Sequence, residues 1–432
     1  MKRLLCLISA YCLVAGTALA GEVPPSPAPR WWRGNLHTHT LWSDGDGFPE
    51  MVAEWYRDHG YHFLALSDHN VLSRGQRWRP VKDIVSRAQT DAYGAYLNRF
   101  GPHWVETRNA ASQETLEVRL KPLEEYRALV EERGRFILLE AEEITHSAQN
   151  GRTFHMNVTN LNEVVRPRDA ATVREAIGNN LQAVQESAER TGRAILVQVN
   201  HPNYRWGVTA EDLAAVVSIQ FFEVWNGVDS DNDPGDEHHP STDEIWDIAN
   251  ALRIAGLGAP PLYGLATDDS HDHHGNKTRA LPGRGWVMVR ARHLTPEAIL
   301  RAMRAGDFYA STGVELDDVI FDKQTRTLSL QIRPAGNETF VTRFIGTRRG
   351  VNLKGKPRLD NNGRVVETTL DYRSADGPQI GEVLGEVKGA RPSYKFRGDE
   401  LYVRAIVTSS ARTKVRSSEF EFKRAWTQPV GW

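Results

Sequence analysis

Histidine and acidic side chains recur where short apolar runs of this sequence end. In the segment NLHTHTLWSDG, His37 and His39 are two residues apart, and Asp44 follows beside a glycine. Side chains at positions i and i+2 of an extended chain point to one face, so both imidazoles can reach a single ion. Imidazoles mixed with carboxylates suit zinc, manganese or iron(II), so this segment indicates a metal site.

The same residue types follow, or lie within, five later apolar runs. They occur in HFLALSDHN, FILLEAEEIT, FHMNVTN, ILVQVNHPN and LYGLATDDSH, and are Asp68, His69, Glu143, His155, His201, Asp269 and His271. A single histidine after a strand is more often a hydrogen-bonded residue than a ligand, and Asp44 and Asp68 could cap helices. Even with Asp68 left out, nine ligand-type positions in step with successive strands favour a multinuclear metal site over that explanation.

These apolar runs alternate with amphipathic stretches over residues 31–313. Helices are predicted over residues 49–59, 123–133, 172–191, 210–217, 242–254 and 296–305, and strands over residues 62–67, 135–139, 194–199, 219–224, 262–266 and 285–289. Parallel strands with intervening helices predict a barrel, which places its active site at the C-terminal ends of the strands. We therefore expect an α/β fold with a distorted (β/α)7 TIM-like barrel. Residues 70–122 are an insertion in it that could form a helical lid.

Residues 314–432 show strands without helices. The strands are predicted over residues 327–333, 338–346, 364–370, 400–408 and 415–422. Apolar and polar residues alternate between turns rich in glycine, asparagine and aspartate, which predicts a small antiparallel β-sandwich as an accessory domain. No residue beyond Gly313 matches a ligand position, so this tail is expected to be separable from the chemistry.

The N-terminal segment has the features of a secretion signal. Two cationic residues precede an apolar run over residues 4–16, and small residues stand at Ala18 and Ala20. The run is shorter than the ~20 residues that a membrane-spanning helix needs, so no stable membrane insertion is expected. We predict a periplasmic or secreted protein with a signal peptide over residues 1–20 and a proline-rich spacer over residues 21–30. Cleavage would remove both cysteines, so any metal must be held by histidine and carboxylates.

The overall charge excludes one class of partner. Lys and Arg number 53 against 55 Asp and Glu, a formal net charge of −2. A protein that binds long nucleic acids needs a basic excess, which is missing here. A small-molecule substrate is therefore the expected partner.

The ligand-type segments resemble those of the PHP (polymerase and histidinol phosphatase) family of metal-dependent hydrolases. The resemblance rests on HTHTLWSDG, LSDHN, AEEIT, FHMNV, VNHPN and DDSH, which lie between residues 35 and 271. The barrel followed by a β-rich tail is similar to an exported, carbaryl-hydrolase-like branch. By resemblance to the trinuclear members, the first metal would be held by His37, His39, Glu143 and Asp269, the second by Glu143, His155 and His201, and the third by Asp44, His69 and His271.

Two of these assignments have competitors in the sequence. Glu140, Glu142 and Glu143 compete for the position that bridges two metals, and Asp268 competes with Asp269. Glu143 is preferred because Glu-Ile-Thr matches the acid-aliphatic-hydroxyl run of the family, and Asp269 because it gives Asp-x-His. The neighbouring His273 and His274 are expected at the rim of the site.

The resemblance implies two to three divalent ions (zinc, manganese or iron) and a metal-bridging hydroxide that attacks a small phosphorylated substrate or nucleotide. Glu143 would bridge the metals, Asp269 would accept a proton, and His201 or the third metal would assist the leaving group. Candidates for phosphate binding are Arg205, Arg279 and Arg284, although exposed cations are usually only solvated.

Two other functions stay open at this stage. The same hydroxide could attack a carbonyl, which would make the protein a carboxylester or carbamate hydrolase of the carbaryl type. Alternatively, the chain could be a non-catalytic binding protein that metals stabilise. Intact ligands at every position argue against that loss of turnover.

Overall fold

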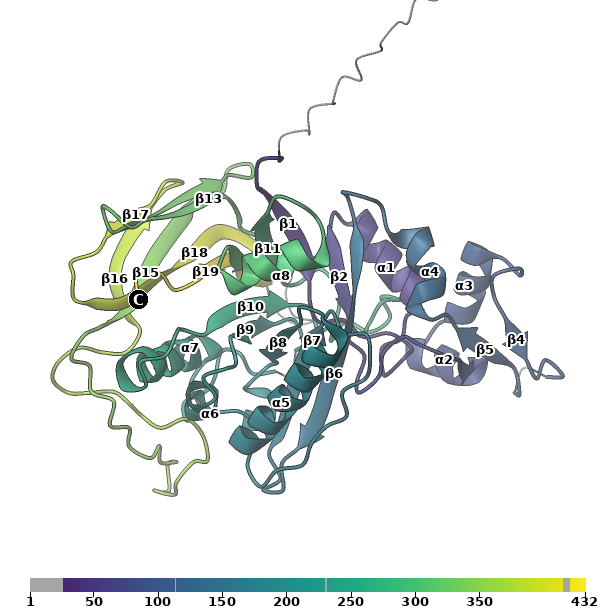
Figure 1. Ribbon diagram of the computed structural model, residues 1–432, viewed down its shortest axis with the longest axis horizontal. Coiled ribbons are helices and arrows are strands. Elements are labelled where there is room, and N and C mark those ends of the chain that lie inside the picture. The colour runs from purple at the N-terminus through teal and green to yellow at the C-terminus, as the bar shows by residue number, and fades with distance from the viewer. Residues whose placement is uncertain (1–25, 113, 230, 415–419) are drawn as a thin grey trace, which may run out of the picture.

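A large curved sheet organises this protein. The computed structural model describes residues 26–112, 114–229, 231–414 and 420–432 (Figure 1). Thirteen strands form the sheet in the order β10-β9-β8-β7-β6-β2-β1-β11-β12-β19-β18-β15-β16. The predicted signal peptide and the first part of the spacer lie outside the described residues. No helix in the described part of the chain is long and apolar enough to cross a membrane.

The strands that carry the ligand-type residues form one half of this sheet. They are β1 (Arg30–Asn35), β2 (Phe63–Leu66), β6 (Ile137–Ser147), β7 (Thr153–Thr159), β8 (Leu196–Val199), β9 (Phe221–Asn226) and β10 (Tyr263–Thr267). Strands β1, β2 and β6 pair in parallel, as do β8, β9 and β10. Strand β7 lies between these groups and is antiparallel to both of its neighbours.

Helices pack beside this half of the sheet (Figure 1). They are α1 (Pro49–Asp58), α4 (Leu123–Val130), α5 (Val173–Thr191), α6 (Ala210–Ala215), α7 (Thr242–Ala251) and α8 (Pro296–Arg304), with short turns η1 (Tyr204–Trp206) and η2 (Leu252–Gly256). Residues near each helix end determine where the helix starts and stops. Thr172 and Glu175 form a capping box that starts α5, and Gly192 at φ 68° ends it. Helix α4 ends before the predicted residue 133 because Glu131 is extended and accepts the N–H of Leu138.

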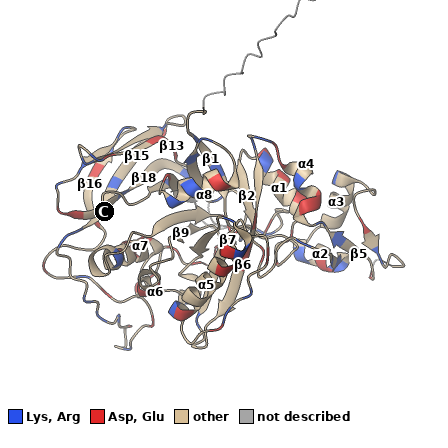
Figure 2. Ribbon diagram, viewed as in Figure 1, with Lys and Arg blue, Asp and Glu red and all other residues tan. Residues whose placement is uncertain are grey.

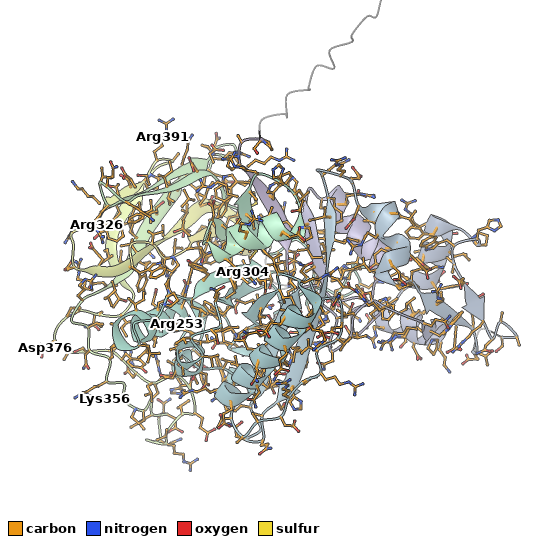
Figure 3. All side chains as sticks on the ribbon, in the orientation of Figure 1. Arg253, Arg304, Arg326, Lys356, Asp376 and Arg391 are labelled. Carbon is orange, nitrogen blue, oxygen red and sulfur yellow. The ribbon has the colours of Figure 1, made fainter. Side chains whose placement is uncertain are left out.

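The turn η2 carries a buried arginine that joins the segments leading into two neighbouring strands. Arg253, labelled in Figure 3, donates to the carbonyls of Ile219 at 2.9 Å, Val217 at 2.6 Å and Pro260 at 2.8 Å. These carbonyls precede β9 and β10. The arginine therefore fixes the entry of both strands into the sheet.

The remaining strands extend the sheet antiparallel. They are β11 (Trp286–Ala291), β12 (Phe308–Ser311), β15 (Phe340–Arg348), β16 (Glu382–Lys388), β18 (Glu400–Lys414) and β19 (Phe420–Thr427). A three-stranded sheet of β13 (Glu315–Asp322), β14 (Thr327–Arg333) and β17 (Ser393–Lys395) shares an apolar core with them. Cationic and acidic residues are interspersed over both halves of the molecule, in keeping with the balanced net charge (Figure 2).

The structure does not confirm a regular (β/α)7 barrel followed by a separate β-sandwich. The strand predicted over residues 285–289 is β11, which pairs antiparallel with β1 instead of joining a parallel series. The sheet also continues past Gly313, because β12 pairs with β19 and Ala310 lies opposite Trp426. What is established is a mixed α/β fold with one large sheet.

Two further segments differ from their predictions. Residues 364–370 are irregular, because their polar groups bind α6: Thr369 Oγ1 accepts the N–H of Ala210 at 2.9 Å, and Glu211 Oε1 accepts that of Leu370 at 2.9 Å. The insertion over residues 70–122 is not purely helical. It contains α2 (Val81–Ala88) and α3 (Ala92–Phe100), and a small sheet of β3 (Arg77–Pro80), β4 (Thr107–Arg108) and β5 (Glu117–Leu120).

Candidate metal centre

The segment after β1 brings the first two histidines beside the end of β10. Thr38 pairs in parallel with Ser270, which places His37 and His39 next to the residues that follow β10. The side chain of Asn35 fixes the bend by donating to the carbonyl of His37 at 3.0 Å. The i, i+2 spacing predicted from the sequence therefore presents both imidazoles to one centre.

The loop that carries Asp44 is held by the neighbouring strand end. Asp68 accepts the N–H of Thr40 at 2.8 Å and both the N–H and the hydroxyl of Ser43, at 3.0 and 2.6 Å. Gly45 is required in this loop, since a Cβ there would lie 2.6 Å from the carbonyl carbon and oxygen of His39. Asp68 thus positions Asp44 instead of capping a helix.

Glu143 and His155 lie inside strands and not at strand ends. Strand β6 continues past its predicted end at residue 139 to Ser147, and Glu143 lies opposite Asn157 of β7. Because β7 runs antiparallel, its first residues lie at the edge where the parallel strands end. His155 therefore reaches the centre from the start of its strand.

Four buried side chains converge at the middle of the site. His37 Nε2 lies 3.1 Å from Asp269 Oδ1 and 3.2 Å from Glu143 Oε1. His39 Nε2 lies 3.0 Å from Asp269 Oδ1 and 3.4 Å from Glu143 Oε2. Within the described chain, no hydrogen bond is made by His37 Nε2, His39 Nε2, Glu143 Oε2 or Asp269 Oδ1. These four atoms belong to the four residues that the resemblance assigns to the first metal.

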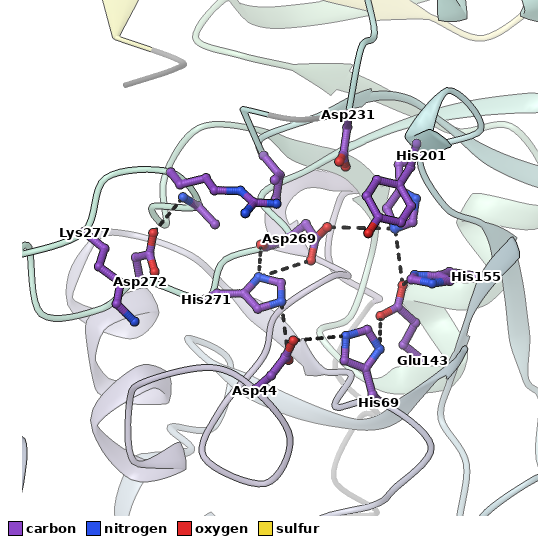
Figure 4. A pocket seen from close by; sticks show the side chains of 14 residues that line it. Asp44, His69, Glu143, His155, His201, Asp231, Asp269, His271, Asp272 and Lys277 are labelled. Atoms are coloured by element: carbon purple, nitrogen blue, oxygen red, sulfur yellow. Dashed lines mark hydrogen bonds and ion pairs between the residues drawn. The ribbon is translucent and has the colours of Figure 1, made fainter. Parts of the chain in front are cut away.

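The other predicted ligands flank this central group on two sides (Figure 4). On one side, Glu143 Oε1 lies 3.1 Å from His155 Nδ1 and 3.5 Å from His201 Nε2. On the other, Asp44 lies 3.5 Å from His69 Nε2 and 3.4 Å from His271 Nε2. The groups overlap, because His69 Nδ1 is also 2.7 Å from Glu143 Oε2. The structure thus brings all nine predicted ligand residues into one cluster.

The residues present fit divalent metal ions. Ligand atoms bound to one small ion at about 2.1 Å lie about 3.4 Å apart, which matches the spacing in the cluster. Buried polar atoms without hydrogen bonds are costly unless another partner satisfies them. Nitrogen and carboxylate oxygen donors together are compatible with zinc, manganese or iron(II).

Charge coupling within the cluster prepares the carboxylates for ligation. Burial would raise the pKa of Glu143, but His69 and His37 outweigh it and hold that pKa well below its usual range. Burial would lower the pKa of His69, but Glu143 and Asp44 raise it to about 11. The carboxylates are therefore ionised, whereas His69 must lose a proton before it can bind a cation, so metal binding would release protons.

The structure separates the competing acidic residues. Glu140 accepts from Arg74 Nη2 at 2.6 Å, outside the cluster. Glu142 points to the opposite face, where it accepts the N–H of Val165 at 2.6 Å. Asp268 accepts the backbone N–H groups of three successive residues, at 2.9, 2.6 and 2.7 Å, and so anchors the segment 283–285. Of these competitors, only Glu143 and Asp269 lie in the cluster.

Glu223, which the sequence analysis missed, orients a predicted ligand. Its Oε1 lies 2.7 Å from His37 Nδ1, and its Oε2 accepts the N–H of His201 at 2.9 Å. An ionised carboxylate only accepts, so His37 Nδ1 carries a proton, which leaves Nε2 as the ring atom that would bind a cation. The signal for Glu223 was an acid within the apolar strand FFEVWN, because a buried acid needs a partner.

The predicted phosphate-binding arginines have three different environments. Arg279 lines the cavity above the cluster. Arg205 is exposed and lies against the ring of Tyr204, outside the lining. Arg284 is only 3% exposed and donates to backbone carbonyls, so its assignment to substrate binding is not supported. A buried guanidinium that donates its hydrogen bonds to protein carbonyls is not placed to bind a substrate phosphate.

His273 and His274 do not form the rim of the cavity. The N–H of His273 donates to Asp46 at 2.7 Å, and its Nε2 lies 3.2 Å from the carbonyl of His39. His274 Nε2 lies 3.2 Å from the carbonyl of Asp46. Both histidines therefore support the loop beside Asp44.

A cavity of about 410 Å³ opens above the cluster (Figure 4). Its walls include Tyr204, Asp231 and Lys277. The Tyr204 ring lies 5.3 Å from that of His201, and the next residue, Arg205, has φ 50°. Burial raises the pKa of Asp231 to about 7, with Asp269 acting in the same direction and His201 against it.

Comparison with known proteins gives distant structural neighbours. No family model matches the sequence, and no curated protein matches it. One neighbour is a two-domain protein from Bacteroides vulgatus containing a predicted PHP-like metal-dependent phosphoesterase, with 14% identity, a TM-score of 0.40, and 90% of this chain and 92% of that chain covered. Another is a candidate metal-dependent phosphoesterase from Bifidobacterium adolescentis, with 14% identity, a TM-score of 0.29, and 59% and 91% covered. Both scores are low, so the function proposed below rests on the site residues.

Protein purified without chelator is expected to contain two or three divalent transition-metal ions per chain. Nine ligand-type side chains exceed the about four to six that one such ion takes. Elemental analysis of the purified protein measures this content. A reproducible value of one ion or fewer would contradict a multinuclear centre.

Proposed function

We propose that this chain is an exported metal-dependent phosphoesterase of the PHP type that hydrolyses a small phosphorylated substrate or nucleotide. The main support is the set of four buried ligand-type atoms without hydrogen bonds, on His37, His39, Glu143 and Asp269, of which Glu143 and Asp269 line an open cavity. His37, His39, Glu143 and Asp269 would hold one ion, Glu143, His155 and His201 a second, and Asp44, His69 and His271 a third.

Divalent ions held there would polarise a phosphoryl oxygen and lower the pKa of a water. The side chains would divide the remaining tasks. Glu143 contacts both the central and the His155 groups, so it would set their spacing. Asp269 would accept a proton and His201 would assist the leaving group, and both side chains line the cavity where a substrate would lie.

The cavity wall favours a phosphoester over a neutral carbamate or carboxylester. Lys277 and Arg279 both line the cavity above the cluster, as do the carboxylates of Asp231 and Asp272. Once divalent ions are bound, these two cations would add to the attraction of an anionic substrate, whereas they would give an uncharged ester no advantage. This charge is the reason for placing phosphoester hydrolysis first.

A substrate screen tests the proposal directly. The mature protein, loaded separately with zinc, manganese or iron(II), would be assayed on phosphomonoesters, phosphodiesters, carboxylesters and carbamates. We expect turnover of phosphoesters that is abolished by chelator and restored by metal. Turnover confined to carboxylesters or carbamates would contradict the phosphoesterase, and no turnover in any metal form would favour a binding protein.

Replacing His69 with alanine is expected to remove only one of the ions. Asp44 and His271 remain in place, and the central group keeps all four of its members. If the third ion orients the phosphate, KM should rise more than kcat falls, because uniform binding is lost. Metal content and kinetics would be measured together.

His146→Ala provides the matched control for this prediction. His146 lies on the same strand as Glu143 but pairs with Asp169 at 2.5 Å, away from the cluster. Metal content and kinetics of this variant should equal those of the wild type. A His69→Ala protein that loses every ion would show that the three groups do not bind separately.

A further inference from the structure

One buried arginine joins the two loops that wall the cavity. Arg284 Nη1 donates to the carbonyls of Gly227 at 2.5 Å and Arg279 at 2.7 Å, and to Asp229 Oδ1 at 3.0 Å. The N–H of Asp229 also donates to the carbonyl of Arg279 at 3.2 Å. The loop after β9 and the loop after β10 are therefore held together as one unit.

These joined loops present groups of opposite charge to the same cavity. The loop after β10 carries Lys277 and Arg279 on the lining, together with Asp272, whose Oδ2 accepts the N–H of Ala280 in the same loop at 2.9 Å. The loop after β9 carries Asp231, whose side chain lines the cavity although the residue is only 2% exposed (Figure 4). The cavity thus has a cationic part and a separate acidic position.

A phosphate group cannot use both parts equally. The metal-ligand floor and the two cations attract the phosphoryl oxygens, whereas a carboxylate repels them. Asp231 therefore faces the remainder of the substrate, which leaves with the ester oxygen. A carboxylate accepts hydrogen bonds, so the substrate group that it favours is one that donates them, such as an ammonium or a hydroxyl.

Tyr204 completes this side of the cavity. Its ring lies 5.3 Å from that of His201 and 5.7 Å from that of His155. The two residues after it, Arg205 and Trp206, have φ values of 50° and 52°, and Trp206 stacks on His239 at 3.8 Å. Left-handed backbone at two successive residues other than glycine is strained, and such strain concentrates at ligand sites.

We infer that Asp231 selects phosphomonoesters whose leaving group carries an ammonium or hydroxyl close to the ester oxygen. This inference rests on the proposed function, because it assigns the phosphate to the metal-ligand floor. Asp231 would act as a specificity residue that touches the substrate. Arg284 would act as a positioning residue, since its contacts are with the two loops.

Binding of phosphonates tests the inference without turnover. The carbon-phosphorus bond resists hydrolysis, so calorimetry on metal-loaded protein at pH 8 can compare 2-aminoethylphosphonate, 2-hydroxyethylphosphonate and ethylphosphonate. We expect at least one ligand with a donor to bind wild-type protein about tenfold or more tightly than ethylphosphonate. Comparing the affinities of 2-aminoethylphosphonate and 2-hydroxyethylphosphonate shows whether the site prefers an ammonium or a hydroxyl.

Asp231→Asn should reduce this preference to about twofold or less. Glu237→Gln is the matched control, because Glu237 lies on the same loop but is exposed and outside the lining. It should keep the wild-type preference. Metal content and thermal unfolding of each variant show that the centre is intact.

Three results separate the possibilities. Wild-type protein that binds all three phosphonates equally overturns the inference, whether or not Asp231→Asn folds. An Asp231→Asn protein that retains the preference also overturns it. Selective binding by Asp231 in a protein that hydrolyses no phosphomonoester would support recognition by this residue and contradict the phosphoesterase itself.

Discussion

Replacing Glu143 with glutamine is expected to remove most of the bound metal and nearly all turnover. Its two oxygens contact His37, His39 and His155, so it is shared between the central group and a flanking group. The glutamine amide lacks the negative charge with which the Glu143 carboxylate would stabilise two bound metal ions. Losing about 4 kcal/mol of transition-state stabilisation corresponds to a fall of about 10³-fold in kcat/KM. Elemental analysis and steady-state kinetics on the same sample measure both effects.

Glu142→Gln is the control for this substitution. Glu142 is the preceding residue of β6 and is also buried, but it points away from the cluster. Burial raises its pKa to about 8, so at pH 7 the group is largely protonated and resembles an amide. Metal content and turnover should be unchanged. A Glu143→Gln protein with full metal and near-normal kcat would remove Glu143 from the proposed centre.

Replacing Asp247 with alanine is expected to destabilise the whole chain by about 3–5 kcal/mol. Asp247 on α7 accepts from Arg404 of β18 at 2.8 and 2.7 Å and from the hydroxyl of Tyr402 at 2.7 Å. The exposed fractions are 4% for Asp247 and 1% for Arg404. Removing the carboxylate leaves the buried positive charge of the Arg404 guanidinium with fewer hydrogen-bond acceptors and less opposite charge beside it. Denaturant unfolding of the variant and the wild type measures the change.

A surface ion pair on the same tail provides the comparison. Arg343 and Glu386 pair at 3.0 Å, with side chains 60% and 44% exposed. Glu386→Ala should cost only about 0–1 kcal/mol, because solvent screens exposed pairs. Equal effects of Asp247→Ala and Glu386→Ala would contradict a structural role for the buried pair.

The same contacts bear on the separability of the tail. Trp426 and Tyr372 belong to one apolar core with Trp246 and Ile245 of α7. The Gln428 side chain also pairs with both backbone groups of Gly264 on the edge of β10, at 2.9 Å each. The tail therefore completes the core of the preceding region. A chain that ends at residue 313 is expected to be insoluble, contrary to the expectation from the ligand positions alone.

The sequence alone identified the residues that the fold brings together. Positions such as His37 and His39 could be recognised because the spacing of side chains along an extended backbone is a local property. Helix ends such as that of α5 were predictable for the same reason, since Thr172 and Gly192 act on adjacent backbone groups. The nine ligand-type positions required only their residue types and their places relative to apolar runs.

Only the tertiary structure decided which neighbours these residues have. The direction of β7, which brings His155 in from its first residues, depends on pairing with β6 and β8. The burial of Arg284 and the contact between Glu223 and His37 join segments far apart in the chain. The continuation of the sheet past Gly313 likewise depends on pairing between β12 and β19. Such contacts are set by the packing of the whole chain, and local residue patterns do not encode them.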